Sequence, residues 1–251
     1  MITLAMENRH SLHRLVSFAR RSFLLFVLLL FPIQSSASSC VVLLHGLAQF
    51  TSAMNKLETR LERSGYNVAF IRYPWRKESP GVLAEDAVGR GINQCRESGS
   101  EQIDFVTHSF GGILVRLYLE KHSLEELGQV VMLSPPNQGT RLVDFLAYVP
   151  GFGVLGGPSA AALGTAEDSV LNELGPVDFK LGVIAGSIDV NPLSWFLLQG
   201  QSDGLVSVES TKVEGMDAHV VLPVIHNIMM RNDTVIDHTI HYLKTGSFML
   251  E

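Results

Sequence analysis

The chain has 251 residues, 46% of them hydrophobic, and a formal net charge of −6 at pH 7. This length can bury one substantial core but hardly two. An acidic chain without a basic stripe has no electrostatic reason to bind nucleic acid. The sequence also contains no internal repeat and no Cys/His cluster with metal-ligand spacing, so we expect one domain without a metal site.

The first 37 residues have the pattern of a signal peptide. Arginines precede an apolar run at 23–33, which is too short to span a bilayer comfortably but suits a signal h-region, and small residues at 35–37 offer a cleavage site. Removing residues 1–37 takes away four of the 19 Lys and Arg residues and one of the 25 Asp and Glu residues, which leaves 15 basic and 24 acidic residues and a net charge near −9. We expect a periplasmic or secreted protein with a mature domain at 38–251. An uncleaved segment would instead anchor the protein at the inner membrane.

The mature chain alternates apolar strand patterns with helical patterns. We expect strands near 41–45, 67–72, 103–107, 129–134, 180–186 and 219–225. Helical stretches lie between or after them, among them 53–64, 82–96, 112–122 and 234–244. This alternation predicts an α/β fold with a parallel, doubly wound sheet and right-handed crossovers.

The first predicted strand ends in a glycine turn. The apolar run at 41–44 is followed by the letters H-G-L-A-Q at 45–49, as in a strand that is buried on both faces and then turns. Such a loop can supply one of the two backbone N–H groups of an oxyanion hole, and Leu47 is the candidate. We interpret His45 as a structural histidine that braces the loop through hydrogen bonds.

The third predicted strand leads into a serine turn with the letters V-T-H-S-F-G-G at 106–112. Ser109 stands between an apolar strand and an apolar helix, as in a nucleophile elbow, and Gly111 and Gly112 provide the small residues that such a turn needs. Thr107 occupies a position where the elbow pattern has glycine. The motif alone therefore also fits an ordinary turn or a phosphate-binding loop. In an elbow, Phe110 would supply the second oxyanion N–H.

A serine nucleophile needs a histidine to accept its proton and a carboxylate to orient that histidine. Two candidate aspartates, Asp189 and Asp203, lie in the loop after the fifth predicted strand. Asp203 lies in the letters S-D-G-L-V-S at 202–207. Asp189 lies closer to the strand, where it is either the acid or a turn-forming residue ahead of Pro192.

His226 is the candidate base because the apolar strand at 220–225 ends at this residue, at the carboxyl edge of the sheet. His219 begins the same strand and is expected at the opposite end. His238 and His241 fall on the final helix, where they are more simply packing or surface residues.

Four motifs occur in the order seen in one known family: H-G at 45–46, S-F-G-G at 109–112, D-G-L-V at 203–206 and the late His226. With these, the chain resembles the α/β-hydrolases of the bacterial lipase and esterase branch over about residues 40–244. The letters S-P-P-N-Q-G-T at 134–140 are similar to the loop that leads into the lid of those lipases. The resemblance implies the strand order 2-1-3-4-5-6, a triad of Ser109, Asp203 and His226, and no cofactor.

The two cysteines are expected to meet at the amino edge of the sheet. Cys40 opens the first strand, and Cys95 ends a helix that has run back to that edge. Export permits a disulfide between them, although two unpaired thiols remain the alternative. By the chain-entropy model such a bridge would stabilise the fold by about 4 kcal/mol.

The segment 139–178 holds apolar residues without clear periodicity among glycines and alanines. It suits a lid or acyl pocket, or else a packed pair of helices that completes the core. The apolar stretch 192–198 is a second candidate for lining the same cleft.

These patterns predict an exported serine hydrolase that cleaves small-molecule or lipid esters. Two alternatives remain open. The same machinery also serves an acyltransferase or a thioesterase. The second alternative is a non-catalytic envelope binding protein with this fold, and Thr107 is the only hint of it.

Overall fold

The structure, a computed structural model, describes residues 39–47, 51–166 and 169–250. In these residues six strands form one sheet in the order β2-β1-β3-β4-β5-β6. Every neighbouring pair is parallel. The predicted fold class and strand order are thus confirmed. The predicted signal peptide at 1–37 lies outside the described residues.

The strands match the predicted segments closely except at the last one. Their bounds are β1 Ser39–Leu44, β2 Asn67–Ile71, β3 Gln102–His108, β4 Leu127–Leu133, β5 Leu181–Gly186 and β6 Ala218–Leu222.

The prediction that the last strand runs to Ile225 was wrong, because β6 ends at Leu222. Pro223 has no N–H group with which to continue a ladder. The chain then turns, and the Val224 amide donates to the Leu222 carbonyl at 2.8 Å. His226 consequently lies beyond the strand, at the start of a 3-10 helix.

Helices cover both faces of the sheet. The α-helices are α2 Asn55–Arg63, α3 Pro80–Leu83, α4 Gly89–Glu97, α5 Phe110–Leu119, α6 Arg141–Ala147, α7 Phe152–Ala161, α8 Ser194–Leu197 and α9 Asp233–Thr245. Short 3-10 turns are η1 Thr51–Ala53, η3 Val170–Glu173, η4 Glu209–Thr211 and η5 His226–Arg231, and η2 Ala84–Val88 is a π-helical turn that joins α3 to α4.

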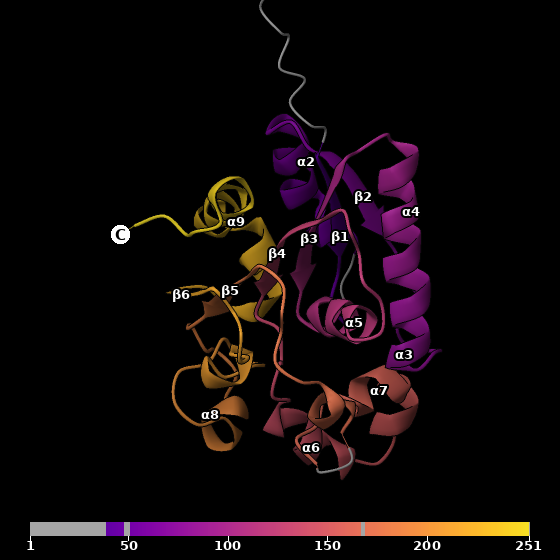
Figure 1. The fold of residues 1–251 in the computed structure, drawn as a ribbon. Coiled ribbons are helices and arrows are strands. Elements are labelled where there is room, and N and C mark those ends of the chain that lie inside the picture. The colour runs from indigo at the N-terminus through magenta and orange to yellow at the C-terminus, as the bar shows by residue number, and fades with distance from the viewer. Residues whose placement is uncertain (1–38, 48–50, 167–168, 251) are drawn as a thin grey trace, which may run out of the picture. The chain divides into compact units, whose positions relative to one another are not determined.

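Two apolar layers form because successive strand residues point to opposite faces. In β1, Val42 and Leu44 belong to the layer under α3, α4 and α5, whereas Val41 and Leu43 belong to the layer under α2 and α9. Figure 1 shows these helices on their two sides of the sheet and α6, α7 and α8 beyond the carboxyl ends of the strands. That edge is where a parallel sheet places its functional residues.

The opposite, amino edge holds the disulfide. Cys40 in β1 and Cys95 in α4 are bonded, with their Cα atoms 5.5 Å apart, as the sequence predicts. Both cysteines are buried. The bond therefore ties α4 to the first strand far along the sheet from the Ser109 turn.

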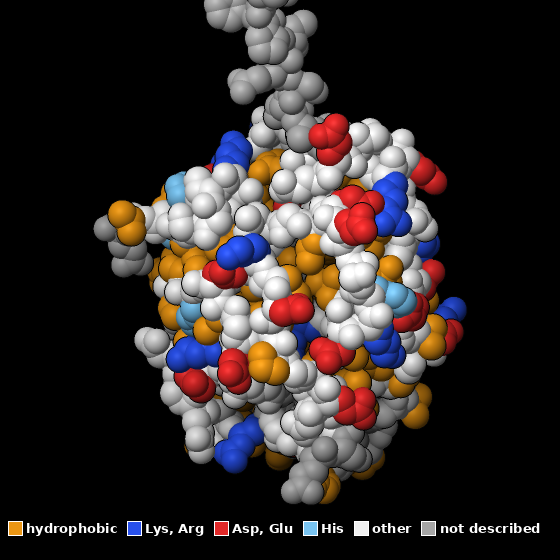
Figure 2. All heavy atoms as spheres, viewed as in Figure 1, with side chains coloured by type: hydrophobic (Ala, Val, Ile, Leu, Met, Phe, Trp, Pro, Cys, Tyr) orange, Lys and Arg blue, Asp and Glu red, His pale blue; other side chains and the backbone are white. Residues whose placement is uncertain are grey.

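The surface gives two further facts. On the face drawn in Figure 2, basic and acidic side chains are interspersed. Among the described residues, none of the helices has both the length and the apolar character needed to cross a bilayer.

Candidate active site

Ser109 occupies a strained turn between β3 and α5. Its φ of 52° and ψ of −121° lie in a region that non-glycine residues rarely adopt. Its amide donates to the Leu133 carbonyl at 2.8 Å, which holds the turn against β4. A side chain at Gly111 would lie 2.9 Å from the Leu44 carbonyl. The strand-serine-helix turn thus has the backbone of a nucleophile elbow.

Thr107 is accommodated because it still belongs to β3. It pairs with Leu44 on one side and Met132 on the other, and it is fully buried. Its hydroxyl has no hydrogen-bond partner among the described residues. The tight approach of the turn falls instead on Gly112, where an added Cβ would meet the Met132 sulfur at 3.0 Å.

The loop after β1 reaches the serine turn directly. An added Cβ at Gly46 would lie 2.9 Å from the Cβ atom of Ser109, so only glycine allows this approach. Leu47 follows and lines the same cavity as Ser109. Phe110 is the first residue of α5, where a helix leaves its N–H groups without an intrahelical acceptor. Leu47, which lines the cavity, and Phe110, which follows Ser109 in the chain, thus both lie beside the serine turn.

His45 braces this loop, as its structural interpretation requires. Its Nδ1 donates to the Gly46 carbonyl at 2.7 Å, and its ring stacks on Tyr73 at 4.2 Å between centroids. The Tyr73 hydroxyl donates to the His45 carbonyl. Burial lowers the pKa of His45, so the ring is neutral at pH 7.

Asp203 and His226 form a buried pair at the same edge. His226 Nδ1 lies 2.7 Å from Asp203 Oδ2, and the His226 amide donates to the Asp203 carbonyl at 3.0 Å. The side chain of His226 is 5% exposed and that of Asp203 is 0% exposed, so the hydrogen bond is shielded from water. The Nδ1 contact leaves Nε2 as the ring nitrogen available to accept a proton.

The Asp203 carboxylate is held in its ionised form. Burial alone would raise its pKa, but the attraction of His226 and hydrogen bonds from His226, Ser134 and Val206 outweigh burial and lower it. Val206 donates its amide to Oδ1 at 2.8 Å. The Ser134 hydroxyl also accepts from the Gly186 amide at 3.2 Å, which links Asp203 to the ends of β4 and β5. An ionised, oriented carboxylate is what a histidine base requires.

Sequence reasoning did not assign roles to His108 or Ser134. His108 Nε2 donates to the His226 carbonyl at 3.1 Å, and the two rings lie 4.6 Å apart between centroids. Burial, followed by the nearby charge of His226, keeps the pKa of His108 well below its usual range. The neutral His108 therefore holds the loop that carries His226. Its position beside Ser109 was the available signal, whereas nothing in the sequence pointed to Ser134.

A cavity of about 340 Å³ opens beside Ser109 and His226. Thr140, Asn227, Pro136 and Gly156 contribute to its wall, and most of the rest is apolar: Leu47, Trp75, Leu142, Val143, Leu146, Phe152, Ala160, Leu163, Leu205 and Val206. Eight of the lining residues come from the predicted 139–178 segment: Thr140, Leu142, Val143, Leu146, Phe152, Gly156, Ala160 and Leu163. Trp75, from the loop after β2, was not anticipated.

The segment 139–178 contributes to the cavity through only some of its predicted residues. Leu146 and Phe152 line the cavity, whereas Phe145, Tyr148, Val149 and Val154 are exposed. The stretch 192–198 does not line this cavity. Leu205 and Val206, next to Asp203, take that place.

The other candidate histidines and aspartate lie elsewhere. His219 lies in the first half of β6, where its Nε2 contacts the Thr211 hydroxyl at 2.9 Å. His241, on α9, contacts the Ser247 carbonyl at 2.8 Å through Nδ1. Asp189 is not paired with a histidine among the described residues. Its carboxylate accepts hydrogen bonds from Ser194, Ser202 and Asn191.

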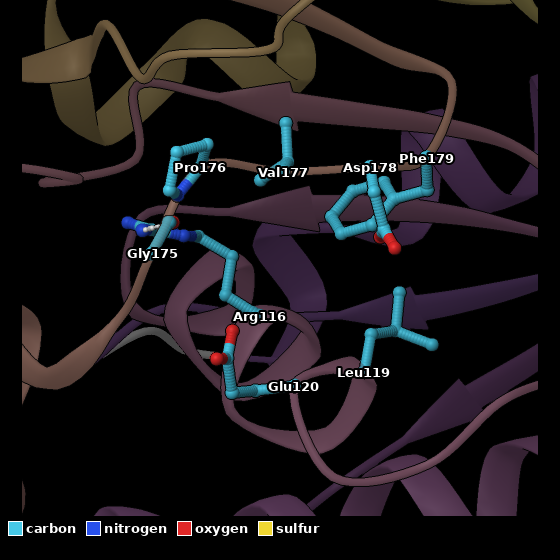
Figure 3. A pocket seen from close by; sticks show the side chains of 8 residues that line it. All are labelled: Arg116, Leu119, Glu120, Gly175, Pro176, Val177, Asp178 and Phe179. Carbon is cyan, nitrogen blue, oxygen red and sulfur yellow. Dashed lines mark hydrogen bonds between the residues drawn. The ribbon is translucent and has the colours of Figure 1, made fainter.

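A second, smaller cavity of about 200 Å³ lies beside α5, and Figure 3 shows Arg116 extending from that helix toward Gly175. The guanidinium donates to the Gly175 carbonyl at 3.0 Å and to Asn137 Oδ1 at 3.2 Å. Burial lowers the pKa of Arg116 to about 10. This buried cation fastens the helix after Ser109 to Asn137, just before the segment 139–178, and to Gly175 near the end of that segment. None of the predicted site residues lines this cavity.

Within the part of the chain that the structure describes, no group of three or more His, Cys, Asp or Glu side chains is arranged to hold a metal ion.

Solved structures of lipases and esterases resemble this chain. The lipase BlEst2 from Bacillus licheniformis, in mature form, is 19% identical with a TM-score of 0.63, over 85% of this chain and 94% of that one. An esterase from Exiguobacterium antarcticum is 15% identical with a TM-score of 0.58, over 83% and 92%. The phospholipase PlaB from Legionella pneumophila is 18% identical with a TM-score of 0.57, over 80% of this chain but 57% of that one.

No protein-family model and no curated protein sequence matches the chain. At these low identities the structural likeness establishes the fold and leaves the chemistry to the residues. The chain has the α/β-hydrolase fold, in agreement with the predicted resemblance.

Proposed function

We propose that this protein is an exported serine hydrolase that cleaves carboxylic esters with an apolar acyl group. The observation that carries the proposal is the convergence of three features on one cavity: the strained Ser109 turn, the buried His226–Asp203 pair at 2.7 Å and a largely apolar wall. The lipases and esterases of similar fold agree with this chemistry.

The residues have complementary roles in the proposed reaction. The Ser109 hydroxyl attacks the ester carbonyl, and His226 Nε2 takes its proton while Asp203 holds Nδ1. The amides of Leu47 and Phe110 donate to the oxyanion of the tetrahedral intermediate. His226 then gives the proton to the leaving alcohol. In the second half His226 takes a proton from water, the water oxygen attacks the acyl carbonyl, and the Ser109 oxygen leaves with that proton as the carboxylic acid is released. No cofactor takes part.

The substrate class follows from the cavity wall. Apolar side chains from the segment 139–178 line the same cavity as Ser109, and these can remove an acyl chain from water. A small-molecule ester or the ester of a lipid fits this surface. The segment 139–178 acts in this proposal as the acyl pocket.

Export is part of the same proposal. The N-terminal pattern at 1–37 is typical of a signal peptide, and the Cys40–Cys95 disulfide is of the kind that persists in oxidising compartments. The catalytic domain is then 38–251. N-terminal sequencing of the protein recovered from the periplasm tests this: a start near residue 38 supports cleavage, and a start at Met1 contradicts it.

Hydrolysis of p-nitrophenyl esters of graded acyl length tests the activity. We expect kcat/KM to rise with chain length until the cavity is full and then to level or fall, while Ser109→Ala shows none of this dependence. A folded wild-type protein that hydrolyses none of the esters would refute the proposal.

A further inference from the structure

Asp203 lies outside the helices and strands, so regular secondary structure does not hold it in place. Asp203 lies within the long connection at 187–217, between β5 and β6. It is nevertheless packed against the end of β5, where a Cβ at Gly186 would lie 2.7 Å from the Asp203 Cβ. Residues 199–208 contain no helix or strand apart from an isolated antiparallel bridge between Ser202 and Ser207. Other contacts must therefore hold the acid at the sheet edge.

Besides Ser134 and His226, Asp189 makes contacts that reach this loop. Its Oδ2 atom accepts from the Ser202 hydroxyl at 2.5 Å and from the Ser194 hydroxyl at 2.5 Å. Its Oδ1 atom accepts from the Asn191 amide at 2.8 Å, and the Asn191 side chain donates to the Gly204 carbonyl at 2.9 Å. The two chain neighbours of Asp203, Ser202 and Gly204, are thus both tied to the 189–191 turn.

These contacts exceed what a turn-forming aspartate needs. Such a residue uses one oxygen to bind the amide two residues ahead, as Oδ1 does with Asn191. The second oxygen of Asp189 binds a hydroxyl 13 positions away in the chain, on the residue next to Asp203. The contact is charge-assisted, and hydrogen bonds of that kind are about twice as strong as neutral ones.

The ionised form of Asp189 is favoured where it stands. Partial burial and the neighbouring Asp203 charge would raise its pKa, but hydrogen bonds from Ser194, Ser202 and Asn191 outweigh both and lower it. Asp189 does not line the Ser109 cavity, so it has no contact with a substrate bound there.

We propose that Asp189 is a positioning residue for Asp203, acting through the Ser202 hydroxyl. This inference rests on the proposed function, in which Asp203 orients His226. Loss of the Asp189–Ser202 contact lets Asp203 shift relative to His226 Nδ1. A small displacement of a catalytic group lowers kcat by roughly tenfold to a hundredfold. The apolar cavity is untouched, so KM stays as in the wild type.

Ser202→Ala and Ser194→Ala form a matched pair for the test. Each variant removes one hydroxyl that donates to the same Asp189 oxygen, and both serines are buried, but only Ser202 adjoins Asp203. We expect Ser202→Ala to lower kcat at least tenfold at constant KM and Ser194→Ala to keep kcat within about twofold. Equal losses in the two variants, with equal melting temperatures, would overturn the proposal.

A double-mutant cycle separates this inference from the proposed function. Asp189→Asn is combined with Asp203→Asn, and the rate of Ser109 labelling by a fluorophosphonate is measured, since this rate remains measurable in weak variants. A residue that acts only through Asp203 has no further effect once Asp203 is replaced. We therefore expect Asp189→Asn to slow labelling in the wild-type background and not in Asp203→Asn.

Each other outcome of the cycle has a defined meaning. The same loss in both backgrounds means that Asp189 acts elsewhere, which overturns the inference but leaves the proposed triad intact. A near wild-type rate for Asp203→Asn beside an inactive Asp189→Asn would make Asp189 the acid and overturn the proposed function itself. If Asp189→Asn does not fold, as judged by its thermal melt, the Ser202 and Ser194 pair decides.

Discussion

The Ser109 turn and the Asp203 loop meet at one edge of the sheet but are held there in different ways. Ser109 is positioned chiefly by residues next to it in the chain, because β3 and α5 fix both sides of a turn with a φ of 52°, and its amide also donates to the Leu133 carbonyl of β4. Asp203 is positioned by contacts from distant parts of the chain, among them Ser134, Gly186 and His226. The position of Ser109 therefore depends mainly on local structure, whereas the position of Asp203 depends mainly on tertiary contacts.

The difference bears on how each region tolerates change. Backbone strain like that of Ser109 costs about 1–3 kcal/mol and persists only where the surrounding elements enforce it. Two regular elements and a buried glycine pair do so here. The Asp203 loop has no regular element of its own and depends on individual hydrogen bonds, so single substitutions around it should shift the acid without unfolding the protein.

The largest effect is expected from removing the nucleophile. Ser109→Ala should lower ester hydrolysis by several powers of ten, because only binding and oxyanion stabilisation then remain. The fold should be retained, since alanine is no larger than serine. Steady-state rates and a thermal melt of the purified variant check both statements, and near wild-type turnover would remove Ser109 from the mechanism.

The next effect separates the two aspartates. Asp203→Asn should lower kcat by roughly 10⁴-fold, as expected when a triad histidine loses the carboxylate that fixes its tautomer. Asp189→Asn should lower kcat far less, because Asp189 acts on Asp203 only through the Ser202 hydroxyl. Parallel measurement of kcat for the two variants checks the ranking, and the reverse order would transfer the acid role to Asp189.

Removing the disulfide should affect stability and leave the chemistry unchanged. A Cys40→Ala, Cys95→Ala double variant loses a link across a sequence separation of 55 residues, worth about 4 kcal/mol. For a protein of this size we expect the melting temperature to fall by roughly 10 °C. The kcat value measured well below that temperature should match the wild type, because the bond lies at the amino edge of the sheet.

Mass analysis provides the control for the disulfide. Wild-type protein from the periplasm should gain two alkyl groups only after reduction. Two free thiols before reduction, or a double variant with an unchanged melting temperature, would count against a stabilising bond.

The smallest effect is expected at Thr107, in the strand that leads into the Ser109 turn. Thr107→Val replaces a buried hydroxyl that has no partner among the described residues by a methyl group of similar size. The free energy of unfolding should stay the same or rise by up to about 1 kcal/mol, with kcat unchanged. Thr107→Gly, which restores the usual motif, should instead destabilise β3 by roughly 1 kcal/mol. Urea unfolding curves distinguish the two, and a greater loss of stability in Thr107→Val would show that the hydroxyl is needed.

The same contrast explains what could be predicted from the sequence. The strand order and the Ser109 turn follow from contiguous patterns, namely apolar runs and a serine beside glycines. The end of β6 was mispredicted because the apolar letters continue after Pro223, although this residue cannot extend the ladder.

The contacts around Asp203 could not be predicted in the same way. Ser134 reaches Asp203 only because β4 and β5 are neighbours in the sheet, and Trp75 reaches the cavity from a loop after β2. No spacing in the sequence encodes such proximity. The two candidate acids also look similar as residues, and the difference is that Asp203 contacts His226 whereas Asp189 contacts serine and asparagine residues.

The central claim is that Ser109 is an activated nucleophile, and covalent labelling tests it most directly. Wild-type protein is treated with a fluorophosphonate probe at pH 7, digested and examined by mass spectrometry, with Ser109→Ala and heat-unfolded protein as controls. The account predicts one probe per chain, attached to Ser109, at a rate that Asp203→Asn slows strongly. Folded wild-type protein that takes up no probe, or takes it up at another residue, would contradict the claim.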